Sequence, residues 1–269
     1  MNLSFIAGLV IAILVVVLGV AADGTGLVFA NLSGFWNPTG LIITFGGTLA
    51  VLIASHPLSM LTDIPLHFKV ILRRKQDQVF YVDIMTELSY DARKKGIMSL
   101  EENIAGIDDN FLRQSVRLLI DGTDPEKARE KLNSELVNIE NRHASAAGIY
   151  DKGAALAPAF GMIGTVIGLI NMLGAMGIED AGGFQILARS MMLALVTIFY
   201  GLILANAFFV PIASQLRMAH EQEMICKEIV IEGIISIQAG ENPRHIHDKL
   251  LSYLTEEQRE RAGGDDESD

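Results

Sequence analysis

The sequence predicts an all-α polytopic membrane protein with four transmembrane helices and a helical cytoplasmic domain. Four apolar stretches contain no Asp, Glu, Lys, Arg or His, and each is close to the roughly 20 residues that a helix needs to cross a hydrocarbon core. Of the 21 Lys and Arg residues, only Arg189 falls in the short connections between these stretches. The predicted spans are residues 3–22, 38–55, 154–178 and 190–213.

The basic residues also predict how the chain is oriented. Lys and Arg closely follow the second and fourth spans, as they do in cytoplasmic segments of membrane proteins. We therefore expect periplasmic loops at 23–37 and 179–189, and cytoplasmic segments at 56–153 and 214–269, with both termini cytoplasmic. The small residues that end the first span resemble a signal cleavage site. That span is longer than a usual signal core and has no basic residue before it, so we expect it to be retained.

Glycine, proline and capping residues divide the predicted cytoplasmic domain into helices. Gly96 suits a left-handed helix end, and Ser99 and Glu102 match a capping box for the next helix. Residues 124–126, Asp-Pro-Glu, are typical of a helix start, and nothing breaks the pattern before Pro158. The expected helices are 79–95, 110–121, 125 into the third span, the fourth span to 239, and 243–254, before a disordered tail from 263.

Motifs for metal binding, phosphate binding or nucleophilic catalysis are absent from the sequence. His143, His220, His245 and His247 lack neighbouring ligands at metal-binding spacings, and we interpret them as surface residues. The single cysteine, Cys226, cannot form an intramolecular disulfide, so its expected role is packing. We expect no enzymatic activity, no cofactor, no metal and no nucleic-acid partner, with membrane lipid around the spans.

Small residues form one face of each of the last two spans. In the third span this face includes Gly161, Gly164 and Gly168, and in the fourth it includes Ala194 and Gly201. Small faces allow helices to approach closely in lipid. The two faces could pack on each other, or they could surround a partner helix or an ion path.

Polar groups inside the spans are few. Thr165 and Thr197 lie on or beside the small faces; each hydroxyl could bond its own helix or act as a neutral oxygen ligand for an ion. Because the spans contain no Asp, Glu, Lys, Arg or His, a conducting assembly would need such a group from another chain. Pro158 and Pro211 bracket the two helices, and each permits a kink, although proline is also ordinary in transmembrane helices.

Five stretches of the chain carry a family resemblance that covers nearly its whole length. The most specific is residues 157–169, Ala-Pro-Ala-Phe-Gly-Met-Ile-Gly-Thr-Val-Ile-Gly-Leu; the others are residues 92–102, 140–143, 200–213 and 238–243. In these stretches the chain resembles the A subunit of the bacterial flagellar stator, the MotA/PomA family of proton- and sodium-driven motors.

This resemblance implies an assembly in the bacterial inner membrane. Five A subunits would form a homopentamer around the transmembrane helices of two B subunits (MotB/PomB-like), and the B helix would carry the ion-binding aspartate. Passage of Na⁺ or H⁺ would then turn the A ring and drive the rotor protein FliG. The small faces of the third and fourth spans, Gly161, Gly164, Gly168, Ala194 and Gly201, would pack against the B helices.

The resemblance also assigns roles to single residues. Arg93, Lys94, Glu101 and Glu102 would contact the rotor, although the next acidic position of the sodium-type pattern is Ile104 here.

Pro158 and Pro211 would couple ion flow to cytoplasmic movement, and Thr165 and Thr197 would line the ion pathway. Ile198 replaces the second threonine of the sodium-type pair. Thr165 and the sequence around it favour sodium over protons.

Three other classes of membrane protein are alternatives. ExbB/TolQ-like energisers of outer-membrane processes have three spans rather than four and lack the charged rotor-contact segment. A solute transporter working alone is disfavoured because the sequence has no inverted repeat and no buried charge. A membrane scaffold that does not conduct is not excluded by sequence.

Overall fold

Nearly all of the chain outside short connections is helical in this computed structural model, which describes residues 3–23, 26–72, 77–101, 106–107, 109–176 and 181–263. The exception among these residues is a pair of two-residue strands, β1 (Ala22–Asp23) and β2 (Gly26–Leu27). They are antiparallel, and Ala22 pairs with Leu27. The predicted all-α fold class is therefore confirmed.

The described residues divide into two units, which we call the membrane unit and the polar unit. The membrane unit is drawn from Met1–Arg74 and Ala144–Arg217, and the polar unit from Lys75–His143 and Met218–Asp269. We expected the cytoplasmic domain to span 56–153. Within that range, residues 56–72 and 144–153 group with the apolar helices, because side chains such as Ile71 and Tyr150 are buried in the same core as those helices.

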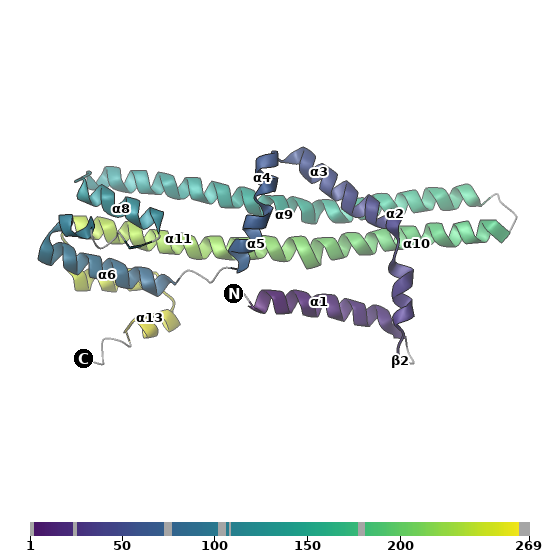
Figure 1. The fold of residues 1–269 in the computed structure, drawn as a ribbon, viewed down its shortest axis with the longest axis horizontal. Coiled ribbons are helices and arrows are strands. Elements are labelled where there is room, and N and C mark those ends of the chain that lie inside the picture. The colour runs from purple at the N-terminus through teal and green to yellow at the C-terminus, as the bar shows by residue number, and fades with distance from the viewer. Residues whose placement is uncertain are drawn as a thin grey trace. The chain divides into compact units, whose positions relative to one another are not determined.

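The membrane unit contains the predicted spans (Figure 1). Its elements are α1 (Leu3–Ala21), the 3₁₀ helix η1 (Phe29–Phe35), α2 (Pro38–Leu41), the π-helix η2 (Ile42–Gly46), α3 (Gly47–Ser55), α4 (Leu58–Thr62), α5 (Ile64–Leu72), the second part of α9 (Pro125–Ala175), α10 (Ala181–Ile203), the π-helix η4 (Leu204–Phe209) and the first part of α11 (Val210–Gln238).

Within the described chain, three helical segments are long and apolar enough to cross a membrane: Pro38–Ser55, Pro125–Ala175 and Gly183–Gln238. The segment Phe5–Ala21, which is part of α1, is also apolar but shorter than these three. The count of four spans stays a prediction, with Phe5–Ala21 as the span still to be shown.

Helix α10 begins earlier than the fourth span was predicted to begin. Residues 181–189, expected to belong to a loop, are helical. The prediction used hydropathy, which marks where a helix enters hydrocarbon rather than where it starts. No proline breaks this segment, so the helix extends beyond the apolar stretch.

The polar unit contains α6 (Gln78–Lys95), the 3₁₀ helix η3 (Ile97–Ser99), α8 (Asn110–Ile120), the first part of α9, the second part of α11, α12 (Pro243–Leu251) and α13 (Glu256–Gly263). Asp77, Asp109 and Asn242 cap α6, α8 and α12, since each side chain accepts a hydrogen bond from a backbone N–H of the first turn. Helix α13 was not predicted. It includes Gly263, the first residue of the proposed disordered tail, and the rest of that tail lies outside the described residues.

Two predicted boundaries differ in detail. Helix α6 ends at Gly96 as expected, but Gly96 has φ 87° and ψ 161° rather than left-handed helical angles. The Ser99 hydroxyl donates to the carbonyl oxygen of Gly96 at 2.7 Å, and the Glu102 half of the predicted capping box lies outside the described residues. The predicted continuation of one helix from Pro125 into the third span is confirmed by α9.

Candidate functional site

The glycine face of α9 lies against α10 of the same chain, and the two helices run side by side in Figure 1. A Cβ atom added to Gly164 would stand 2.5 Å from the Cβ of Thr197, and one on Gly168 would stand 2.6 Å from the Ser190 carbonyl oxygen. A Cβ on Gly201 of α10 would stand 2.6 Å from a carbonyl oxygen of α9. No side chain fits at these distances, so the two backbones are in direct contact.

This contact shows where the predicted partner-helix residues lie within the chain. Gly161, Gly164, Gly168, Ala194 and Gly201 are buried between α9 and α10, so the glycine face is already occupied within the chain. The sequence showed which residues share a face. It left open whether the covering helix came from the same chain, and here it does.

Two hydroxyls lie in this contact. The Thr165 hydroxyl is 3.1 Å from the carbonyl oxygens of both Gly161 and Ala194, so it can donate within α9 or across to α10. The Thr197 hydroxyl is 3.0 Å from the Leu193 carbonyl oxygen of its own helix. Thr197 is fully buried, whereas Thr165 is partly exposed. Of the two predicted ion-pathway residues, Thr165 is the one that another chain or an ion could reach.

The second span adds two buried hydroxyls that the sequence analysis did not single out. Thr44 and Thr48 are fully buried. The Thr44 hydroxyl donates to the Thr197 carbonyl oxygen at 3.5 Å, and the Thr48 hydroxyl donates to the Thr44 carbonyl oxygen at 2.6 Å. The spacing of four residues in an apolar stretch would have placed both on one helix face. The Thr44 hydroxyl therefore joins the second span to α10, whereas the Thr48 hydroxyl bonds within the second span.

An apolar stripe on α9 is left uncovered after α9 and α10 pack together. Met162, Val166, Ile170 and Leu173 are each more than half exposed, and their spacing of three and four residues places them on one face. Asn171 beside them is also exposed. In a membrane this stripe would contact lipid or the helices of other chains.

The two prolines have different surroundings within the membrane unit. Pro211 is the second residue after η4, and because proline has no N–H to donate to the carbonyl four residues earlier, its position accounts for the wide π turn there. Pro158 lies inside α9, which continues through it, and a Cβ on Gly201 would stand 3.1 Å from its Cα. Pro158 therefore lies at the α9–α10 contact.

In the polar unit, exposed charges gather where α6 ends. We call this group the charged corner, and its described members are Arg93, Lys94, Lys95 and Glu101.

Within the charged corner, Lys95 Nζ pairs with the Asp91 carboxylate at 3.0 Å. Among the described residues, Arg93 and Glu101 form no ion pair, and both side chains are exposed. Glu102, the fourth predicted rotor-contact residue, lies outside the described part of the chain.

Other charges of the polar unit do stabilise it. Glu232 of α11 pairs with Lys249 of α12 at 2.5 Å and with Arg129 of α9 at 3.1 Å. Burial alone would raise the pKa of Glu232, but the hydrogen bonds and positive charges of Lys249 and Arg129 lower it. This network joins three helices, in contrast with the charged corner.

Two histidines that we expected at the surface face each other instead. The Nδ1 atoms of His143 on α9 and His220 on α11 are 3.1 Å apart, and both residues are partly buried. Their partnership could not be read from residues 77 positions apart. Throughout the described residues, no group of three or more His, Cys, Asp and Glu side chains could hold a metal ion.

Comparisons with known proteins find relatives along nearly the whole chain. Residues 103–260 match the family model described as "MotA/TolQ/ExbB proton channel family". The chain is 37% identical to Motility protein A of Borreliella burgdorferi over 260 residues, covering 96% of each chain. It is 30% identical to Chemotaxis protein PomA of Vibrio alginolyticus, covering 96% of this chain and 98% of the relative.

A solved structure has a similar fold. The flagellar MotAB stator complex from Bacillus subtilis contains a chain that is 27% identical and superposes with a TM-score of 0.82, with 95% of this chain and 97% of that chain covered. The similarity therefore extends through both units. The chain belongs to the MotA/PomA family of flagellar stator subunits, within the wider MotA/TolQ/ExbB proton channel family.

Proposed function

We propose that this chain is the A subunit of a bacterial flagellar stator, which with a B subunit converts a transmembrane ion gradient into rotation. The observation that carries the proposal is that the spans lack the charged group an ion-driven machine needs. The predicted spans offer hydroxyls, amides and apolar surface but no Asp, Glu, Lys, Arg or His. An ion-driven machine built from this chain needs a partner that brings the charge into the membrane.

The partner helices belong on the exposed stripe of α9. Because Gly164 and Gly168 are covered by α10, a MotB/PomB-like helix would contact Met162, Val166 and Ile170 instead. Five copies of the chain would surround two such helices in the inner membrane, with both termini in the cytoplasm.

The transported ion is proposed to be sodium rather than a proton. Thr165 supports this choice, because its partly exposed hydroxyl oxygen could replace one water of a hydrated sodium ion. Thr197, which is fully buried and bonded within its own helix, is assigned to hold α10 against the second span.

The charged corner is proposed to contact the rotor protein FliG. Arg93 and Glu101 are exposed and form no ion pair among the described residues, so they can meet opposite charges on another protein without first breaking a bond. Lys94 and Glu102 are auxiliary contacts, and Pro158 and Pro211 are the proposed coupling positions between ion passage and movement.

The rotor contact is tested by charge reversal. Arg93→Glu and Glu101→Lys should leave membrane insertion and co-purification with the B subunit intact while reducing swimming. Lys127→Glu reverses an exposed charge on α9 and is the matched control, expected to swim normally. Normal swimming by both corner variants would remove this assignment.

The ion is tested by rotation of tethered cells. At fixed proton-motive force, replacing sodium by potassium should stop rotation, and Thr165→Val should slow it more than Thr197→Val does at equal protein level. Undiminished rotation in potassium would show that protons drive the motor.

A further inference from the structure

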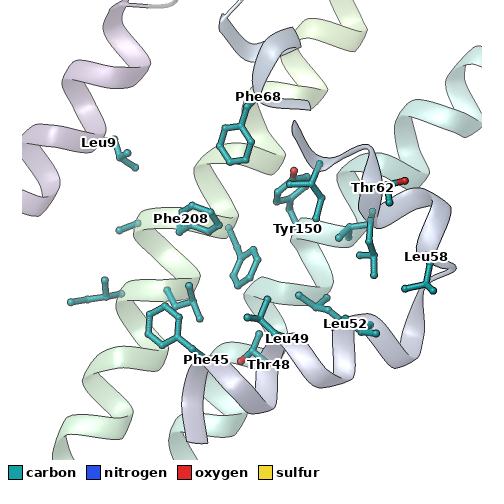
Figure 2. A pocket seen from close by; sticks show the side chains of 18 of the residues that line it. Leu9, Phe45, Thr48, Leu49, Leu52, Leu58, Thr62, Phe68, Tyr150 and Phe208 are labelled. Carbon is teal, nitrogen blue, oxygen red and sulfur yellow. The ribbon is translucent and has the colours of Figure 1, made fainter. Parts of the chain in front are cut away.

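A large apolar cavity lies inside the membrane unit, away from the α9–α10 contact. Its volume is about 780 Å³, within the range of roughly 300–1,000 Å³ that small-molecule sites occupy. Its walls come from α1, η2, α3, α4, α5, α9, the end of α10 and η4. Figure 2 shows Phe45, Phe68 and Phe208 around it, from three different elements. A space enclosed by so many elements is a site rather than an uncovered helix face.

The chemistry of the wall excludes a polar occupant. Every lining side chain is hydrocarbon except those of Thr48, Thr62 and Tyr150. The Thr48 and Thr62 hydroxyls donate to backbone carbonyl oxygens of their own segments at 2.6 and 2.7 Å, and the Tyr150 hydroxyl lies 3.1 Å from His67 Nδ1. The three hydroxyls are therefore satisfied within the chain, and an occupant needs only apolar surface.

The cavity is open on one side. Leu49, Ile53 and Leu58 line it and are each more than half exposed. Leu49 and Ile53 belong to a segment long and apolar enough to cross a membrane. The opening therefore faces the hydrocarbon, from which a lipid chain can enter sideways without crossing water.

Polar groups lie toward one end of the space. Tyr150 precedes the predicted third span, and its partner His67 is on α5, which follows the second span. Aromatic residues with a polar tip are typical of the membrane–water boundary. This end suits a headgroup at the membrane surface, while the part beside Leu52 and Phe45 suits the chain.

We propose that this cavity binds the acyl chain of a membrane phospholipid, held between α1, the second span and α5. The proposal needs the membrane location of the chain but not its role in the motor. Ala207 lines the cavity with the smallest side chain in its wall, so Ala207→Phe fills the space without removing a core side chain. Ala188→Phe is the matched control, because Ala188 is exposed on α10 and is not part of the wall.

The test uses the complete complex of this chain with its B subunit in vesicles of phosphatidylethanolamine and phosphatidylglycerol. A small fraction of the lipid carries a photoactivatable diazirine in its acyl chain, and cross-linked peptides are mapped by mass spectrometry. We expect labelling of cavity peptides from α3, α5 and η4. It should fall several-fold in Ala207→Phe and stay unchanged in Ala188→Phe.

Labelling confined to outward residues such as Met162 and Val166, and equal in both variants, would overturn the proposal. Absence of labelling in the cavity peptides would also overturn it, and would indicate that side chains of a second copy fill the space.

If Ala207→Phe does not accumulate, the unaltered complex still decides the question. Cavity labelling should saturate as the probe fraction rises, whereas labelling of the exposed stripe should rise in proportion; proportional labelling at both places would overturn the proposal. Swimming is scored separately, so loss of motor function is not confused with loss of the lipid site.

Discussion

The membrane unit and the polar unit hold their helices together in different ways. In the membrane unit, α9 and α10 meet through glycine backbones and threonine hydroxyls. In the polar unit, the helices meet through large aliphatic side chains such as Leu132, Ile234 and Leu250, each fully buried. The same helix, α9, contributes to both arrangements.

The difference follows from the surroundings. In water, burying large apolar side chains supplies most of the stabilisation. In lipid, apolar side chains gain little by leaving the surrounding tails, so close backbone contact and hydrogen bonds between helices matter more. Changes in side-chain size should therefore have opposite effects in the two units. Shortening a buried side chain should destabilise the polar unit, and adding a methyl group at the helix contact should destabilise the membrane unit.

The largest effect is expected from shortening a side chain in the hydrophobic core of the polar unit. Leu132→Ala should lower the free energy of unfolding by about 2–5 kcal/mol, because it removes buried surface and leaves a cavity. Thermal melting followed by circular dichroism measures the loss, and hydrogen exchange of polar-unit peptides locates it. Val137→Ala, at a residue 53% exposed on the same helix, is the control and should have little effect. Equal effects at both positions would contradict the proposed core.

A smaller effect is expected from adding a methyl group at the α9–α10 contact. Gly164→Ala places a methyl group 2.5 Å from Thr197 Cβ and should cost about 1–3 kcal/mol as overpacking. Gly174→Ala is the matched control on the same helix, because a Cβ there meets nothing within 4 Å. Melting of the purified complex should fall for Gly164→Ala and hold or rise for Gly174→Ala. A fall of similar size in both would show that the direct backbone contact is not what stabilises the pair.

Sequence predicted the helices well where local chemistry sets their ends. Gly96 and Gly240 end helices as expected because each adopts a positive φ, which glycine tolerates. Residues 124–126 start α9 as predicted, and the absence of a breaking residue carries that helix into the third span.

Contacts across long separations could not be predicted in the same way. The glycine periodicity identified a face but not its occupant, since packing within the chain and packing on a partner need the same small residues. Thr44 was missed because its hydrogen-bond acceptor, the Thr197 carbonyl oxygen, lies far along the chain. Hydropathy also placed the start of the fourth span later than the start of α10.

The smallest effect is expected at the histidine pair, where the polar unit departs from an ordinary aliphatic core. Burial lowers the pKa of His143 from its ordinary value of 6.5, and the positive charges of His220, Arg142 and Lys227 lower it further, while Glu223 opposes them. The unfolded chain therefore binds the proton more readily than the folded chain. The contribution of neutral His143 to stability is therefore fully present above pH 6.5 and is lost as the pH falls below it.

Replacing His143 should remove this sensitivity. Between pH 7.5 and 5.5, the melting temperature of His143→Gln should fall less than that of the unaltered chain. His245→Gln, at an exposed position on α12, is the control and should keep the full pH dependence. Hydrogen exchange should place the difference in peptides of α9 and α11 near the pair. If both variants kept the same pH dependence, the 3.1 Å contact with His220 would not be what makes the polar unit sensitive to acid.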